Sequence, residues 1–403
     1  MKILFLTQVL PYPLDAGPKV RAYYVLRHLA QRHQITLVSF VRATDTPAAI
    51  HHLAQHCHAV KTVPMPRGKL RDGFFLLRSL VSGQPFLMER DWHRAMVTRL
   101  SEVITQDGPF DAVHADQLWM APYARLVREL QMKPLQLVLD QHNAVFTIPE
   151  RMAGAGRNPL KRALLTLEAQ KLARYEVETC HHFDHVTWVT AEDYQAVATQ
   201  ANGHGAPPND GIIPICGDVA ESAPIARKAT ARRLTFVGGL HYPPNAQGIC
   251  WFAEKIFPQI LATVPDVVLT VIGKQPPAQL RALGIPTHNL DVVGFAETLD
   301  TYLAETAVFL VPLLAGGGMR VKIIDGWQWG MPIVSTTIGA EGIITKPGEN
   351  ILIADTPVAF ADAVLSLLQS PRRAATLATN GRRWLEEQYD WRRVYQQWDT
   401  IYG

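Results

Sequence analysis

The sequence predicts an α/β protein made of two Rossmann-like domains in tandem, which face each other across a cleft. Short runs of β-branched and large apolar residues alternate with amphipathic segments of helical length, which is typical of parallel sheets with crossover helices. The alternation pauses at residues 202–232, where glycine, proline and asparagine are frequent, and then begins again. The length of 403 residues suits two to three domains of roughly 150 residues each.

Six candidate strands occupy the first half of the chain. They are residues 2–7, 34–40, 59–63, 111–114, 136–140 and 185–190. Between the first two, Pro18 suits the first turn of a helix. The apolar residues Ala22, Val25, Leu26 and Leu29 then recur with helical spacing, so this connection is predicted to be a helix.

Six more candidate strands occupy the second half. They are residues 233–237, 267–272, 291–293, 307–312, 333–336 and 351–354. Residues 357–402 are predicted to be helical, with breaks near Pro371 and at 388–390. We therefore expect an N-terminal domain at residues 1–215 and a C-terminal domain at 216–387. A closing helix at 388–403 is expected to pack back on the N-terminal domain.

Composition and charge exclude several classes of protein. The chain has 39 Lys and Arg against 36 Asp and Glu, a net charge of +3, and 48% of its residues are hydrophobic. A mainly disordered chain and a dedicated nucleic-acid binder are both disfavoured. No apolar run reaches the roughly 20 residues that span a bilayer, and no secretory signal is visible. The four cysteines are scattered, as in a reducing cytoplasm, where we expect the protein to act.

The glycine pattern does not predict a dinucleotide or P-loop site. A GxGxxG run would follow the first strand, but a long loop with the single glycine Gly17 follows it instead, and no Walker sequence occurs. His52 and His56 have the i, i+4 spacing of metal ligands, but no carboxylate joins them. No bound cofactor and no metal ion are expected.

The segment that follows the strand at 307–312 predicts an anion site. Gly316, Gly317 and Gly318 would let the backbone approach a ligand closely, and a helix is expected from about Met319 to Gly330. The free N–H groups of a first helical turn attract anions. Two cations stand in this same turn, where the helix dipole disfavours them, and a phosphate ligand would resolve the conflict.

These two cations are Arg320 and Lys322. Under the alternative interpretation both are solvated surface residues, with Lys322 paired to Asp325 three positions along the helix. That alternative leaves the three consecutive glycines unexplained.

The segment GGGMRVKIID resembles the donor-binding element of retaining, metal-independent glycosyltransferases of the GT-B fold, the family 4 (glycosyl transferases group 1) type. It is similar in particular to a bacterial subgroup with a GGGMR-V-K-I-(E/D) run before P-(I/V)-V-S-T. The resemblance extends over nearly the whole chain, through segments in the same order. These segments are PYPLDAGPKVRAY, DQHN, FVGGLHYPPN, VVGF, IGAEG and YDWRRVY.

The resemblance implies that the C-terminal domain binds a nucleoside-diphosphate sugar. Carried over by position, Arg320 and Lys322 grip the diphosphate, helped by the backbone N–H groups of Gly318 and Met319. Gly17 approaches the phosphates from the N-terminal domain.

Three further positions would complete the donor site. Asp325 stands where the family usually has a glutamate that binds the ribose hydroxyls, and Gly294 and Phe295 stand where it binds the nucleobase. The position of a second family glutamate, which contacts the donor sugar, is taken by Gly317. This departure leaves the sugar open.

In the N-terminal domain, which the resemblance makes the acceptor domain, His114 and Asp116 lie at a strand end on one face. The family often has a histidine at one of these two places, beside the sugar and the acceptor. His142 could orient the acceptor, and Arg21 could hold an acceptor phosphate or carboxylate. The alternatives are a hydrogen-bonded strand-end histidine, a loop histidine and a solvated arginine.

Together these features predict a glycosyltransferase that moves a sugar to a hydroxyl of a glycan or lipid-linked acceptor, in envelope or exopolysaccharide synthesis. The basic segment 157–174 could lie against anionic lipid at the inner membrane surface, or it could be a charged helix face in water. A sugar-nucleotide 2-epimerase and a non-catalytic nucleotide- or glycan-binding subunit remain as rival functions.

Overall fold

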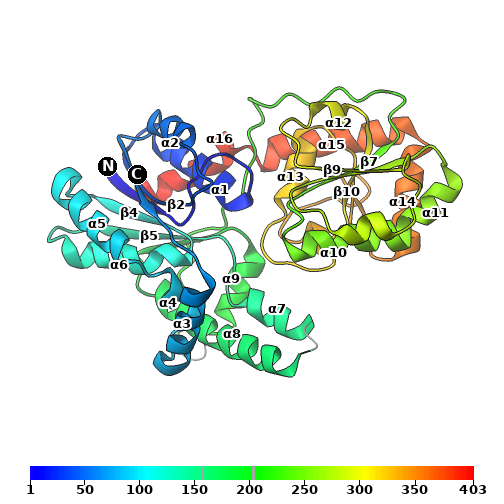
Figure 1. The fold of residues 1–403 in the computed structure, drawn as a ribbon. Helices are drawn as coiled ribbons and strands as arrows, with labels where there is room; N and C mark the ends of the chain where they lie inside the picture. The colour runs from blue at the N-terminus through cyan, green and yellow to red at the C-terminus, as the bar shows by residue number, and fades with distance from the viewer. Residues whose placement is uncertain (156–157, 202–204) are drawn as a thin grey trace. The chain divides into compact units, whose positions relative to one another are not determined.

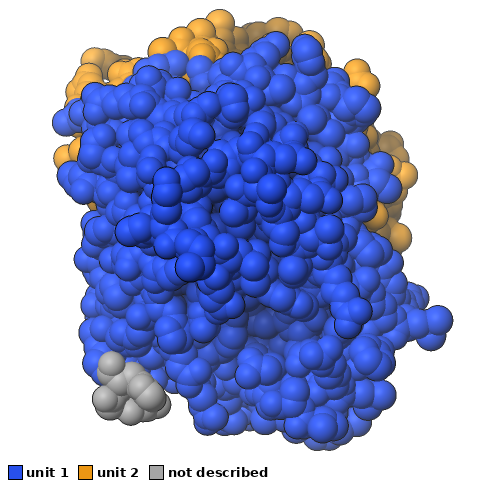
Figure 2. Space-filling model, turned by 90° about the vertical axis from the view of Figure 1, so that its left-hand side faces the viewer, with its two compact units in different colours: residues 1–216, 391–403 blue, residues 217–390 orange. Residues whose placement is uncertain are grey.

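The computed structural model describes residues 1–155, 158–201 and 205–403. The chain divides into two compact units, coloured separately in Figure 2. Unit 1 comprises Met1–Cys216 and Trp391–Gly403, and unit 2 comprises Gly217–Asp390. The boundaries expected from the sequence fall after residues 215 and 387, close to these.

Unit 1 is built on a parallel six-stranded sheet with the order β3-β2-β1-β4-β5-β6. Its strands are β1 (Lys2–Thr7), β2 (Gln34–Val41), β3 (Ala59–Pro64), β4 (Ala112–Asp116), β5 (Gln136–Gln141) and β6 (His185–Trp188). Most residues of the central strands are buried, because helices cover both faces of a parallel sheet. In Figure 1, α1 and α2 lie over one face of this sheet, and α5 and α6 lie over the other.

Unit 1 contains eleven α-helices among its described residues. They are α1 (Gly17–Leu29), α2 (Pro47–Ala54), α3 (Lys69–Ser82), α4 (Phe86–Asp91), α5 (Arg94–Asp107), α6 (Ala121–Leu130), α7 (Thr147–Ala155), α8 (Pro159–Cys180), α9 (Ala191–Ala198), α16 (Trp391–Val394) and α17 (Asp399–Tyr402). The last two belong to unit 1 through side-chain contacts. Trp391 stacks on Tyr24 of α1, and the Asp399 carboxylate forms an ion pair with His28.

Unit 2 repeats the same architecture. Its parallel sheet has the order β12-β11-β10-β7-β8-β9, which is the order of unit 1 viewed from the other edge. The strands are β7 (Arg233–Val237), β8 (Val268–Ile272), β9 (Leu290–Gly294), β10 (Thr306–Val311), β11 (Ile333–Ser335) and β12 (Leu352–Ile353). The helices are α10 (Pro243–Trp251), α11 (Phe257–Thr263), α12 (Asp300–Ala304), α13 (Val321–Gln328), α14 (Pro357–Leu368) and α15 (Pro371–Gln388).

The predicted α/β class and the two Rossmann-like sheets are confirmed, and all twelve candidate strands are present within a few residues. Two differences concern the candidate site. β4 continues past His114 to Asp116, so both side chains belong to the strand. Helix α13 begins at Val321, two residues later than expected, because Arg320 has the non-helical dihedrals of an N-cap (φ −89°, ψ 81°). None of the helices in the described ranges is both long and apolar enough to cross a bilayer.

Candidate functional site

The strand order places the candidate residues at one particular edge of each sheet. In open parallel sheets, ligands bind beyond the carboxyl ends of the strands where the chain order reverses. This switch point lies between β7 and β10 in unit 2 and between β1 and β4 in unit 1. The glycine loop follows β10, and Asp116 ends β4, so both predicted sites lie at a switch point.

The glycine loop of unit 2 has a backbone that other residues would adopt only with strain. Gly316 has φ 130° and Gly318 has φ 71°, both in the region that favours glycine. The Arg320 guanidinium folds back over this loop and donates to the carbonyls of Gly317 (2.5 Å) and Gly318 (3.0 Å). It also forms an ion pair with Glu341 at 2.9 Å, and Arg320 is almost fully buried in this structure.

Lys322 connects the glycine loop to the neighbouring strand at the switch point. Its Nζ donates to the carbonyl of Val237, the last residue of β7, at 3.0 Å and lies 5.4 Å from the centre of the Phe236 ring. A Cβ at Gly238 would lie 2.2 Å from Nζ and would displace the ammonium from this position. The glycine after β7 therefore makes room for the ammonium group.

Burial changes the acidity of the two ionisable groups on α13. It disfavours the charged ammonium and lowers the pKa of Lys322 to about 8, although Asp325 acts in the opposite direction. Burial also raises the pKa of Asp325 to about 6, against the attraction of Lys322. Both groups would gain from a ligand that supplies phosphate charge to the lysine and hydroxyl donors to the carboxylate.

The predicted nucleobase residues lie at the end of β9. Gly294 has φ 79°, and its carbonyl accepts from the Gly273 N–H at 2.6 Å. The Phe295 ring is mostly exposed, and the Lys274 ammonium lies 4.6 Å from its centre. Sequence reasoning missed Lys274, which no motif singles out. Its position just after β8 was the only available signal.

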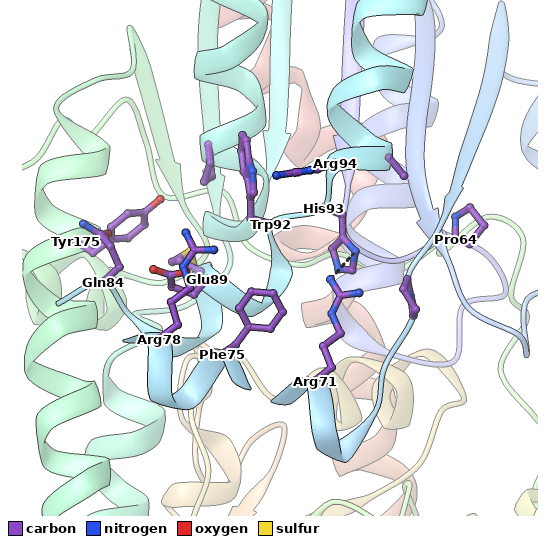
Figure 3. A pocket seen from close by; sticks show the side chains of 14 residues that line it. Pro64, Arg71, Phe75, Arg78, Gln84, Glu89, Trp92, His93, Arg94 and Tyr175 are labelled. Carbon is purple, nitrogen blue, oxygen red and sulfur yellow. Dashed lines mark hydrogen bonds and ion pairs between the residues drawn. The ribbon is translucent and has the colours of Figure 1, made fainter. Parts of the chain in front are cut away.

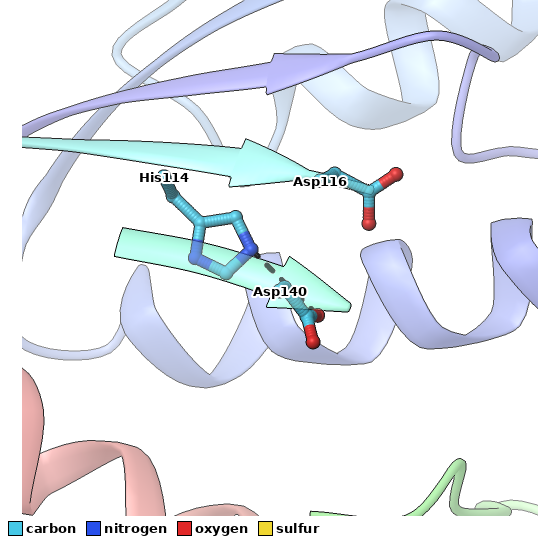
Figure 4. A group of neighbouring side chains, drawn as sticks. All are labelled: His114, Asp116 and Asp140. Carbon is cyan, nitrogen blue, oxygen red and sulfur yellow. Dashed lines mark ion pairs between the residues drawn. The ribbon is translucent and has the colours of Figure 1, made fainter. Parts of the chain in front are cut away.

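Unit 1 has a cluster of buried polar side chains at its switch point (Figure 4). His114 is fully buried, stacks on Phe5 and shares a hydrogen bond of 2.8 Å between Nδ1 and the Tyr402 hydroxyl. Its Nε2 lies 3.8 Å from the Asp140 carboxylate. Burial lowers the pKa of His114 to about 4, so this imidazole is neutral at neutral pH.

His142, in the loop after β5, is positively charged at neutral pH, unlike His114. Its Nε2 lies 2.9 Å from the Asp116 carboxylate and 3.5 Å from that of Asp140. Burial disfavours the imidazolium, but the two carboxylates more than offset this and raise the pKa of His142 to about 9. The cluster therefore holds a neutral histidine and a cationic one side by side.

Arg21 is fully buried in this cluster. Its guanidinium makes a bidentate contact with Asp140 and also donates to the Ile213 carbonyl at 2.6 Å and the Pro214 carbonyl at 3.1 Å. Solvation, one of the two interpretations of Arg21, is therefore wrong, because no part of the side chain reaches solvent. Contact with an acceptor would require this network to open first, and that role stays a prediction.

The loop that carries His142 is held by buried carboxyl groups from two helices. Glu176 of α8 accepts from the Gln141 amide and the Val145 N–H, and Asp193 of α9 accepts from the Ala144 N–H. Burial raises the pKa of Glu176 to about 8. Gln117, directly after Asp116, has φ 71° and ψ 161°, a combination otherwise confined to glycine. Such strain is characteristic of functional sites.

Among the described residues, this cluster contains one group of side chains that could together hold a metal ion. His114, Asp116 and Asp140 each offer a ligand atom within 4.8 Å of the others. Positive charge is already supplied there by Arg21 and His142, which disfavours a cation. The expectation of no metal stays a prediction.

The remaining predicted residues have simpler surroundings. The His52 ring stacks on Tyr12, and its Nε2 shares a hydrogen bond of 2.8 Å with the Tyr23 hydroxyl. Gly17 is the first residue of α1, which follows the carboxyl end of β1. Sequence reasoning missed Asp140, Tyr402 and Glu341 as site residues. Asp140 and Glu341 stand in DQHN and IGAEG, two segments that carry the family resemblance, and this was the available signal.

Comparisons with known proteins agree with this geometry. Residues 231–370, which lie within unit 2, match the family model of glycosyl transferases group 1. An uncharacterized 44.6 kDa protein in the cps region of Klebsiella pneumoniae is 29% identical over 167 residues, which cover 40% of this chain and 43% of that protein. The GDP-mannose-dependent alpha-(1-6)-phosphatidylinositol monomannoside mannosyltransferase of Mycolicibacterium smegmatis is 28% identical over 152 residues, 34% of this chain and 40% of that protein. The chain thus aligns with less than half the length of these curated relatives.

Solved structures match over the whole chain. Alr3699/HepE of Anabaena in complex with UDP-glucose has a TM-score of 0.68 at 16% identity and covers 100% of this chain and 99% of its own. An alpha,alpha-trehalose-phosphate synthase (UDP-forming) from Burkholderia vietnamiensis has a TM-score of 0.61 at 14% identity, with 100% and 98% covered. The fold is that of GT-B glycosyltransferases.

Proposed function

We propose that this protein transfers a sugar from a nucleoside diphosphate to a hydroxyl of a glycan or lipid-linked acceptor, with retention of anomeric configuration and without a bound metal ion. The observation that carries the proposal is the glycine loop at the switch point of unit 2, with Arg320 and Lys322 at the start of α13. The match to the glycosyl transferases group 1 model includes this same segment and supports the proposal.

The difficult step of such a transfer is the departure of the diphosphate while positive charge builds on the anomeric carbon. Fixed donors stabilise a leaving group where its charge develops. Lys322 and the N–H groups at the start of α13 can act in this way. Arg320 can join them by exchanging its bonds to the Gly317 and Gly318 carbonyls for stronger charge-assisted bonds to phosphate.

Other residues of the site would contact the ribose and the base of the donor. Asp325 would accept from the ribose hydroxyls, and Phe295 offers an exposed aromatic face to the base. The relatives differ in their nucleotides, since Alr3699/HepE is named with UDP-glucose and the mycobacterial enzyme with GDP-mannose. Both UDP and GDP donors must therefore be tested.

On the acceptor side, His114, Asp116, His142 and Arg21 of unit 1 are proposed to bind the acceptor once their buried network opens. Retention requires no protein nucleophile if the leaving phosphate takes the proton of the acceptor hydroxyl. A lipid-linked acceptor would place the protein at the cytoplasmic face of the membrane, in envelope or exopolysaccharide synthesis.

Calorimetric titration of the full chain with UDP and GDP, with and without EDTA, tests the donor site. We expect one of the two to bind whether or not EDTA is present. The double variant Arg320→Gln/Lys322→Gln should bind at least about 100-fold more weakly, since two charge-assisted hydrogen bonds are lost. The matched control Arg372→Gln/Arg373→Gln removes two exposed cations of α15 and should bind like the wild type.

Equal binding by both double variants would refute the assigned roles. Incubation of the matching nucleotide sugar without acceptor separates the rival functions. A shifted epimer signal indicates an epimerase. Nucleotide binding without any turnover over a broad acceptor panel indicates a non-catalytic subunit.

A further inference from the structure

Helix α3 carries an apolar stripe that faces away from the core of unit 1. Its members Leu70, Phe74, Leu77 and Val81 are 93%, 61%, 67% and 91% exposed. With about 100° of rotation per residue they fall within about 60° around the helix. An apolar stripe of this spacing normally packs against the core of a globular protein. Here it lies uncovered along about 21 Å of helix, at 1.5 Å per residue.

Basic side chains border this stripe on both sides. Lys69 lies on one flank, and Arg71 and Arg78 lie on the other, each roughly 70–110° from the centre of the stripe. Residues 67–84 contain four basic residues and one acidic residue, and so carry the same net charge of +3 as the whole chain. Long cations beside an apolar face are typical of helices that lie in the interface of an anionic membrane.

The opposite side of α3 is anchored, which fixes the outward direction of the stripe. Ser79 is buried, and its carbonyl accepts from the Lys171 ammonium of α8 at 2.6 Å. The helix is bounded by Gly68 and by Gly83, which has φ 73°. α8 overlaps the segment 157–174, whose contact with lipid was one prediction from the sequence. Of its residues, 157 lies outside the described part of the chain, and Leu160 and Leu167 are exposed apolar residues.

A cavity of about 740 Å³ opens behind α3 (Figure 3). Arg71, Phe75 and Arg78 line it from α3, and Trp92 and Arg94 line it from the start of α5 and the turn before it. Glu89 also lines the cavity and pairs with Arg78 at 2.6 Å, so three guanidinium groups and one carboxylate give the lining a net positive charge. Together with its apolar and aromatic side chains, this charge suits a group that is both anionic and amphiphilic. The cavity and the stripe therefore favour the same kind of partner.

We propose that α3 docks the protein on a bilayer of anionic phospholipid, with the stripe in the acyl boundary and its arginines among the acidic headgroups. This docking surface would bring a lipid-linked acceptor to unit 1. Its biological purpose therefore rests on the proposed function. The binding itself is measurable without any sugar transfer.

Flotation with lipid vesicles tests the docking surface in the full chain. The wild type should float with vesicles of equal parts phosphatidylcholine and phosphatidylglycerol, and much less with phosphatidylcholine alone or in high salt. Leu70→Gln/Phe74→Gln/Leu77→Gln keeps the charge and should lower the bound-to-free ratio at least about tenfold. Lys69→Gln should lower it roughly fivefold.

The matched control replaces three apolar residues that are equally exposed elsewhere. Met132→Gln/Ile344→Gln/Val358→Gln acts at positions that are 98%, 65% and 61% exposed and should float like the wild type. Both triple variants should keep the circular dichroism spectrum and melting temperature of the wild type.

Two outcomes would overturn the docking surface. One is a triple α3 variant that floats like the wild type. The other is a wild type that self-associates without vesicles and becomes monomeric in that variant, which would make the stripe a protein–protein surface. Nucleotide titration of the α3 variant should match the wild type. If the wild type binds no nucleotide yet floats, the proposed function fails and the docking surface stands.

Discussion

The two units share one strand order but differ in how the buried charges at the switch point are paired. In unit 1, Asp140 is enclosed by Arg21, His142 and His114, so each buried charge meets an opposite charge of the protein itself. In unit 2, Lys322 bonds to a backbone carbonyl, and burial lowers its pKa. The same fold thus holds a cluster of paired charges in unit 1 and, in unit 2, a cation whose hydrogen-bond acceptor is a neutral carbonyl.

This difference separates the requirements for stability from those for binding. A buried ion pair that loses one partner leaves an uncompensated charge, which is strongly destabilising. A cation held by neutral carbonyls against its own desolvation gains energy only when an anion arrives. We therefore expect substitutions at the unit 1 cluster to unfold the protein and those at α13 to weaken ligand binding.

The largest effect should follow from Asp140→Asn. The change leaves the Arg21 guanidinium fully buried without its bidentate carboxylate, at a cost of about 3–5 kcal/mol in the free energy of unfolding. Urea denaturation measures it. The control Asp266→Asn breaks an exposed ion pair with Arg232 and should cost less than about 1 kcal/mol. Equal costs in the two variants would contradict the stabilising role assigned to the buried Arg21–Asp140 pair.

The cationic state of His142 predicts a pH dependence of unfolding. Its pKa is about 9 in the folded protein and about 6.5 in an unfolded chain. This raised pKa contributes stability that is fully present below about pH 6.5 and is lost as the pH rises through about 9. The loss should reach about 3 kcal/mol by linkage.

Urea denaturation at pH 6.5 and 9 should show that loss in the wild type, and His142→Asn should flatten the slope. Glu176, whose pKa is raised to about 8, acts with the same sign between about pH 4.5 and 8 in both proteins. The comparison of the two slopes therefore isolates His142. Parallel slopes would contradict the charge assigned to it.

In unit 2, Lys322→Gln should weaken binding of the nucleoside diphosphate by about 10- to 100-fold, the value of one charge-assisted hydrogen bond. Unfolding should change by less than about 1 kcal/mol, because burial already disfavours this charge. The affinity of the wild type should also fall as the pH rises through about 8, where Lys322 loses its proton. Lys322→Arg should lack that fall, since arginine stays charged. A pH-independent affinity in the wild type would argue against an ammonium–phosphate contact.

The fold could be predicted from the sequence because local patterns determine it. Buried parallel strands require continuous apolar runs, and these runs stand out between helical segments. The glycine loop could be predicted as well. Three consecutive glycines before a helix are costly for folding, and a backbone that approaches a ligand closely is one of the few structures that explain them.

Contacts between distant segments could not be predicted in the same way. Arg21 and Asp140 are 119 positions apart, and His114 and Tyr402 are 288 apart. Nothing local in either segment reveals such partners, so Arg21 had the features of a surface cation. The same limit applies to Arg320, whose partner Glu341 lies beyond the next strand.

The smallest expected effect compares a glycine in each unit. Gly326 of α13 packs against β10 and β11, and a Cβ there would lie 2.8 Å from Ile333 Cδ1 and 3.1 Å from Phe309 Cδ1. Gly326→Ala should therefore destabilise by about 1–2 kcal/mol through overpacking, partly offset by helix propensity. Gly73 of α3 has open space around its Cβ position, so Gly73→Ala should stabilise by roughly 0.5–1 kcal/mol. Thermal melting of the two variants measures both. A stabilising Gly326→Ala would mean that α13 can move away from its sheet, and with it the cations that we assign to the diphosphate.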